Sequence, residues 1–104
     1  MDEVKEIELE EGKARLESGA AVFVDVRDAG SFREAHIPGA VHLNDQTVET
    51  FVAQADKQKP VVVYCYHGHT SLGGAAYLME NGFSDVVSLK GGFELWRQTE
   101  KIES

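Results

Sequence analysis

Short runs of β-branched and aliphatic residues alternate with segments of helical character along this chain, and this alternation constrains the fold more than any other feature. Each run is too short to be a helix and has the composition of a strand. The expected strands are residues 4–7, 21–26, 41–43, 61–64 and 86–89. Because a helical segment separates most consecutive strands, these strands are expected to run in the same direction. The sequence therefore predicts an α/β fold with a mostly parallel sheet and helices on both of its faces.

The expected helices are recognised from their caps and from their apolar stripes. Asp28 can cap the start of a short helix, and Gly19 and Gly82 each follow the end of one. The expected segments are residues 8–18 and 28–35, a helix from Asn44 or Asp45, a helix from the loop after Cys65 to about Asn81, and a last helix around Phe93 and Trp96. The residues expected to face the core are Val48, Phe51, Val52 and Ala55, then Leu72, Ala75, Ala76 and Met79, and finally Phe93 and Trp96.

Length, charge and apolar content limit the classes of protein to which the chain can belong. Its 104 residues are enough for one hydrophobic core, so residues 1–104 are expected to form a single domain. The net charge of −8 argues against nucleic acid and anionic membranes as partners. The longest apolar stretch is too short to span a bilayer, and the N-terminal segment does not resemble a signal peptide. We therefore expect a cytoplasmic protein.

The segment around the single cysteine, Cys65, is the strongest candidate for a functional site. Cys65 follows a buried strand, and a loop with Gly68 then leads into a helix. Parallel sheets bind their ligands at such carboxyl ends of strands. Loop amides and the helix N-terminus there would lower the pKa of the thiol and provide a seat for an anion. Gly73 and Gly74 would let the first turn of that helix pack closely. The alternative is that Cys65 is an inert buried residue, but the polar loop favours a functional thiol.

Other charged and metal-binding residue types carry less information. Cys65, His67 and His69 are close in the sequence, but no second cysteine or acid stands at a familiar zinc-ligand spacing. We therefore expect neither a metal nor another cofactor. Asp25 and Arg27 are interpreted as a structural charge pair outside catalysis.

Three blocks of residues resemble a known family. They are Val24 to Asp28 with Phe32 and the segment from His36 to Ala40, the loop from Cys65 to Ser71, and Gly91 to Phe93 with Trp96. The blocks come in the family's order and span nearly the whole chain. On these residues the chain resembles the single-domain rhodaneses, and in particular the GlpE-type thiosulfate sulfurtransferases.

The resemblance implies both a fold and an activity. Rhodaneses have a five-stranded parallel sheet flanked by helices, and their cysteine is a nucleophile. By analogy, the Cys65 thiolate would take the outer sulfur of thiosulfate as a persulfide and pass it to cyanide or to a thiol. A thioredoxin-like protein is a further candidate acceptor. The resemblance also implies that the loop binds the substrate and the persulfide, through Tyr66, His67, Gly68, His69, Thr70 and Ser71.

The loop departs from the pattern of many rhodaneses, which carry an arginine or lysine there. Here Tyr66, His67 and His69 take those places. Two interpretations of the histidines stay open: they supply positive charge when protonated, or they are exposed residues without a kinetic role.

Related folds suggest other functions for the same architecture. Rhodanese-like phosphatases end this loop with an arginine that grips phosphate, but Ser71 stands at that position six residues after Cys65, which disfavours phosphatase chemistry. The remaining alternatives are a non-enzymatic rhodanese-like interaction module, which usually lacks the cysteine, and a persulfide carrier loaded by a protein donor.

Overall fold

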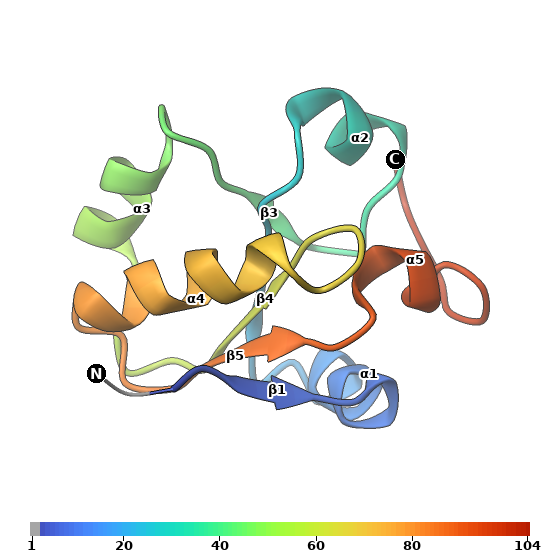
Figure 1. Ribbon diagram of the computed structural model, residues 1–104, viewed down its shortest axis with the longest axis horizontal. Coiled ribbons are helices and arrows are strands. Elements are labelled where there is room, and N and C mark those ends of the chain that lie inside the picture. The colour runs from blue at the N-terminus through green and yellow to red at the C-terminus, as the bar shows by residue number, and fades with distance from the viewer. Residues whose placement is uncertain (1–2) are drawn as a thin grey trace.

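Five parallel strands form one sheet in the computed structural model, which describes residues 3–104 (Figure 1). The order across the sheet is β1-β5-β4-β2-β3, and every neighbouring pair is parallel. The prediction of a mostly parallel sheet is thus confirmed, and all of its strand pairs are parallel. The strands are β1 (Lys5–Ile7), β2 (Val22–Asp25), β3 (Val41–His42), β4 (Val61–Tyr64) and β5 (Val86–Leu89).

Helices cover both faces of this sheet, as the sequence predicted (Figure 1). They are α1 (Leu9–Ser18), α2 (Ala29–Glu34), α3 (Val48–Gln54), α4 (Thr70–Glu80) and α5 (Gly92–Trp96). Side chains of α1 and α5 pack on the face formed by Val62, Tyr64 and Leu89. Side chains of α3 and α4 pack on the opposite face, with Val61 and Val63. None of the helices within residues 3–104 is long and apolar enough to cross a membrane.

The central strand β4 explains why the sheet has two covered faces. All four of its residues are buried, and successive side chains point to opposite sides. Val62 and Tyr64 enter one core, whereas Val61 and Val63 enter the other. A continuous apolar strand of this kind is typical of a position between two layers. Because β4 is also the middle strand of five, its carboxyl end lies at the centre of that edge of the sheet.

The predicted caps of the first two helices are confirmed. Gly19 follows α1 with a positive φ of 70°, and its amide bonds to the carbonyl of Leu16. The Asp28 carboxylate accepts a hydrogen bond from the Ser31 amide at 3.0 Å, at the start of α2.

The predicted start of α3 is wrong by about one turn. Asn44 does not cap the helix; its side chain accepts hydrogen bonds from the amides of Gln46 and Thr47 and so holds a turn before α3 begins at Val48. An asparagine competes for nearby amides in this way because its side chain mimics a backbone carbonyl.

The predicted inward face of α4 is partly wrong. Ala75 is buried as expected, but the other buried positions are Ser71 and Leu78. Leu72 and Ala76 are only partly buried, and so is Met79, although Met79 still packs on the core. The prediction considered only apolar residues, and it therefore passed over a serine whose hydroxyl group is hydrogen-bonded inside the protein. Asn81 caps the helix end, and Gly82 follows with a positive φ of 95°.

Candidate functional site

Cys65 is the first residue after β4, at the edge of the sheet where the carboxyl ends of the parallel strands meet. The loop that starts at Cys65 leads directly into α4 and lies beside α5 (Figure 1). Cys65 is only 5% exposed. The thiol is therefore buried under the loop, where the groups that contact the sulfur determine its chemistry.

The loop directs two backbone amides at the sulfur atom and places a hydroxyl group within hydrogen-bond distance of it. The amides of Gly68 and Ser71 lie 3.1 and 3.3 Å from Cys65 Sγ, and the Ser71 hydroxyl lies 3.4 Å away. Gly68 has a φ of 98°, which residues with a side chain rarely adopt, and this conformation lets the loop turn back over the cysteine. The predicted cradle of loop amides at the N-terminus of α4 is thus present.

The N-terminus of α5 holds the other side of the loop. The amides of Phe93 and Glu94 donate to the carbonyls of Cys65 and Tyr66 at 2.8 and 2.9 Å. In a planar trans peptide the N–H points opposite to the carbonyl, so this contact turns the next two loop amides away from α5. A Cβ atom on Gly92 would lie 2.5 Å from the Cys65 carbonyl oxygen, so the contact requires glycine.

The pKa of the Cys65 thiol is lowered, as the sequence predicted. Burial raises the pKa, but hydrogen bonds from the Ser71 hydroxyl and from the amides of Ser71, Gly68 and His67 outweigh it. The largest single lowering influence is the Ser71 hydroxyl, whereas the sequence analysis considered only the backbone of that residue. The site therefore favours a thiolate.

Most of the remaining predicted loop residues are exposed. The side chains of Tyr66, His67, His69 and Thr70 are exposed, whereas Gly68 is buried. Tyr66 and His67 lie with their ring centroids 4.9 Å apart. Within residues 3–104, none of these four side chains hydrogen-bonds to Cys65, so their roles in binding stay predictions. No three His, Cys, Asp or Glu side chains gather as a metal site in that same range.

One buried polar residue near the cysteine was not predicted from the sequence. Ser88 in β5 is fully buried, and its hydroxyl lies 2.7 Å from the hydroxyl of Ser71. A signal was present in the sequence, because Ser88 interrupts an otherwise apolar strand, Val-Val-Ser-Leu. Its meaning depended on knowing which residue lies opposite.

The two glycines of α4 differ in their packing. A Cβ atom on Gly74 would come within 3.3 Å of Val26 and 3.4 Å of Val63, so this glycine does allow a close approach of the helix to the sheet. A Cβ atom on Gly73 would meet nothing within 4 Å. The prediction is confirmed for Gly74 and wrong for Gly73, which faces outward.

Asp25 and Arg27 form the predicted structural pair. The Arg27 Nε donates to both oxygens of the Asp25 carboxylate at 3.1 Å, and Nη2 donates to Oδ2 at 2.7 Å. Both side chains are buried. The guanidinium also lies 4.2 Å from the ring centroid of Phe93, at the start of α5. The pair therefore connects the end of β2 to the helix that holds the cysteine loop.

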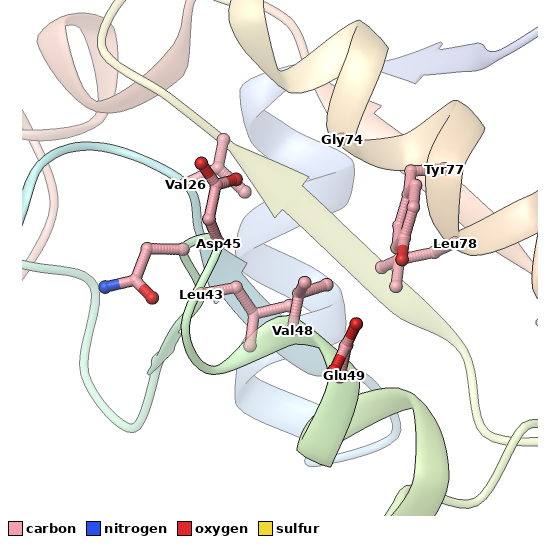
Figure 2. Close-up of a pocket in the computed structure, with 9 residues that line it drawn as sticks. Val26, Leu43, Asp45, Val48, Glu49, Gly74, Tyr77 and Leu78 are labelled. Carbon is pink, nitrogen blue, oxygen red and sulfur yellow. The ribbon is translucent and has the colours of Figure 1, made fainter.

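A pocket of about 450 Å³ lies between α3 and α4, away from this loop (Figure 2). Its floor is apolar, and two carboxylates stand at its rim. No residue from Cys65 to Ser71 lines it. The lining residues are Val26, Leu43, Asn44, Asp45, Val48, Glu49, Gly74, Tyr77 and Leu78.

Comparison with known proteins gives a consistent family. The family model described as a rhodanese-like domain matches residues 8–99. A protein named thiosulfate sulfurtransferase GlpE, from Pseudomonas savastanoi pv. phaseolicola, is 54% identical over 99 residues, covering 95% of this chain and 92% of that protein. A protein of the same name from Pseudomonas fluorescens is 48% identical over 104 residues, covering 100% of this chain and 94% of that protein.

Solved structures agree with the sequence matches. The Alr3790 protein from Anabaena sp. superposes with a TM-score of 0.85 at 27% identity, covering 94% of this chain and 81% of that one. A rhodanese-like domain protein from Staphylococcus aureus superposes with a TM-score of 0.78 at 30% identity, covering 89% and 91% of the two chains.

Proposed function

The chain belongs to the family of rhodanese-like domains, and from this membership and the surroundings of Cys65 we propose that it is a thiosulfate sulfurtransferase. The observation that carries the proposal is the cradle of donors on a cysteine whose pKa is lowered. In this proposal Cys65 is the nucleophile, and the loop from Tyr66 to Ser71 binds the sulfur that is transferred.

The first step of the proposed reaction is a substitution at sulfur. The Cys65 thiolate attacks the outer sulfur of thiosulfate and forms a new S–S bond. The S–S bond within thiosulfate breaks, and its electron pair leaves with sulfite. The enzyme is left with a persulfide, whose negative charge lies on the outer sulfur.

The loop suits this change of charge. The outer sulfur of a persulfide lies one S–S bond of about 2.05 Å beyond Cys65 Sγ. The contact with α5 leaves the amides of Tyr66 and His67 pointing away from that helix and available to an anion, and the N-terminus of α4 adds partial positive charge. Fixed donors of this kind stabilise an anion without having to reorganise during the reaction.

The second step returns the thiolate. Cyanide or a small thiol attacks the outer sulfur of the persulfide, and the electron pair of the S–S bond returns to Cys65. With cyanide the product is thiocyanate. A thioredoxin-like protein with an accessible thiolate is a further proposed acceptor, because it would use the same attack.

Mass spectrometry of the intact protein after exposure to thiosulfate tests the proposal most directly. We expect a mass gain of one sulfur atom, which a reducing thiol reverses and which the variant Cys65→Ser does not show. Initial rates at varied thiosulfate and cyanide should give parallel double-reciprocal lines, because one nucleophile is loaded before it is unloaded.

The same measurements separate the alternative functions. A protein that gains no sulfur from any donor would be an interaction module, and the proposal would be wrong. Loading by a persulfide-bearing protein but not by thiosulfate would identify a carrier with a protein donor. Retained thiocyanate formation in Cys65→Ser, with an unchanged circular dichroism spectrum, would exclude Cys65 as the nucleophile.

A further inference from the structure

Ser88 is a buried polar residue that the reaction described above does not use. It lies in β5 at the position paired with Val63 of β4, which is two residues before the cysteine. Paired residues of neighbouring strands point to the same face, so Ser88 points toward α4 with Val63. The first turn of α4 contributes Ser71 to the same place, and both serines are 0% exposed.

The three groups form a short buried chain of hydrogen bonds. Cys65 Sγ lies 3.4 Å from the Ser71 hydroxyl oxygen, which lies 2.7 Å from the Ser88 hydroxyl oxygen. Ser71 is the one hydrogen-bond partner of the Ser88 hydroxyl within residues 3–104. The chain therefore ends at Ser88.

The direction of the protons along this chain depends on the state of the sulfur. Each hydroxyl has one proton to donate. If a Cys65 thiol donates to Ser71, only one of the two serines can donate to the other, and the remaining hydroxyl proton has no acceptor among the described residues. If the sulfur is a thiolate, Ser88 donates to Ser71 and Ser71 donates to the sulfur, so every proton has an acceptor. A buried donor without an acceptor is unfavourable, and the chain thus favours the second arrangement.

We propose that Ser88 is a positioning residue whose hydroxyl fixes the Ser71 hydroxyl as a hydrogen-bond donor to the Cys65 sulfur. Ser88 does not touch the substrate and acts only through Ser71. Its consequence for catalysis rests on the proposed function, because a hydrogen-bond donor at the sulfur stabilises the thiolate that acts as the nucleophile. Its physical content, the direction of one hydrogen bond, is independent of which sulfur donor the protein uses.

The pH dependence of Cys65 alkylation by iodoacetamide tests this proposal, since only the thiolate reacts. Ser88→Ala should raise the apparent pKa of Cys65 and slow alkylation below that pKa by about three- to fivefold, which corresponds to one weakened hydrogen bond. Ser71→Ala should have at least the same effect. Because Ser88 acts through Ser71, adding Ser88→Ala to Ser71→Ala should change the profile no further.

Two further variants separate the hydroxyl from the volume of the side chain. Ser88→Thr and Ser88→Val introduce side chains of the same shape, and only the first keeps a hydroxyl. We expect Ser88→Thr to keep the wild-type profile and Ser88→Val to behave like Ser88→Ala. Ser84→Ala is the matched control, because it removes an exposed hydroxyl that donates to the Lys57 carbonyl before β5; its profile should equal that of the wild type.

A profile for Ser88→Ala that equals the wild type would overturn the proposal, whatever the change in thermal stability. So would a shift that adds in full to that of Ser71→Ala, or equal profiles for the Thr and Val variants. Alkylation requires no sulfur donor, so these results are independent of the loading experiment. Persulfide formation with an unshifted Ser88→Ala profile would therefore refute the role of Ser88 alone.

Discussion

Replacing Gly92 with alanine should damage both the stability of the protein and the cysteine site. Gly92 has a φ of 57°, and a Cβ atom there would lie 2.5 Å from the Cys65 carbonyl oxygen and 2.6 Å from that of Tyr66. These two carbonyls accept the amides that begin α5. Either the start of α5 or the loop at Cys65 and Tyr66 must therefore move. Both changes would displace the loop that holds the reactive sulfur.

The size of the effect follows from two contributions. A residue with a side chain costs about 1–2 kcal/mol in the left-handed conformation. Inserting a methyl group into a filled space costs a further 1–3 kcal/mol or so. A loss of about 2–5 kcal/mol in the free energy of unfolding should lower the Tm by about 10–25 °C, at roughly 5 °C per kcal/mol for a chain of this size. Displacement of the loop amides should also reduce kcat/KM by about tenfold or more.

Gly19→Ala provides the matched control. Gly19 also has a positive φ, at 70°, but a Cβ atom there would meet nothing within 4 Å. This variant should lose only about 1 kcal/mol, because the conformational cost is partly offset by a stiffer unfolded chain. Its activity and its alkylation profile should match the wild type. Thermal melts, thiocyanate formation and alkylation would be measured for both variants. Equal destabilisation of the two, with full activity in Gly92→Ala, would refute the argument that α5 orients the cysteine loop.

Three shorter predictions concern charge. Asp25→Ala should lower the free energy of unfolding by about 3–5 kcal/mol, measured by denaturant titration, because it leaves a buried guanidinium without its carboxylate. Because the pKa of Cys65 is lowered in the folded state, the unfolded chain binds more protons at pH values between that pKa and the ordinary thiol pKa. The free energy of unfolding should therefore rise with pH across this window, and it should rise less in Cys65→Ala. Replacing His67 and His69 together with glutamine should leave the alkylation profile of Cys65 nearly unchanged, because both side chains are exposed and neither bonds to the sulfur. A large upward shift in that double variant would assign the lowered pKa to the histidines.

The layers of the fold and the position of the cysteine could be predicted because each depends on local patterns. The run Val61 to Tyr64 is apolar at every position, which is typical of a strand covered on both faces. Once that strand is assigned, Cys65 must lie at its carboxyl end, and the glycine and the helix that follow indicate a cradle for an anion. These inferences require only neighbours in the sequence.

What could not be predicted depends on pairs of residues far apart in the sequence. Ser71 and Ser88 are 17 residues apart, and their contact needs the register of β5 against β4 together with the packing of α4. Gly73 and Gly74 are adjacent and identical, yet only Gly74 faces the sheet, because the rotation of the helix is set by its packing. The start of α3 could not be predicted because an asparagine side chain can either cap a helix or stabilise a turn, and both have the same local sequence. In the structure Asn44 stabilises a turn.

The cradle also explains how a protein of net charge −8 can hold an anionic sulfur and attract an anionic substrate without an arginine in the loop. The acidic surface acts at a distance and is screened within about 8 Å at physiological salt. Hydrogen bonds from the amides of Gly68 and Ser71 act at 3.1 and 3.3 Å, well inside that length. Backbone amides do not titrate, and their direction is fixed by the path of the loop, which α5 holds at Cys65 and Tyr66, rather than by flexible side chains. The reactivity of Cys65 should therefore depend on the geometry of the loop far more than on ionic strength or on the total charge of the chain.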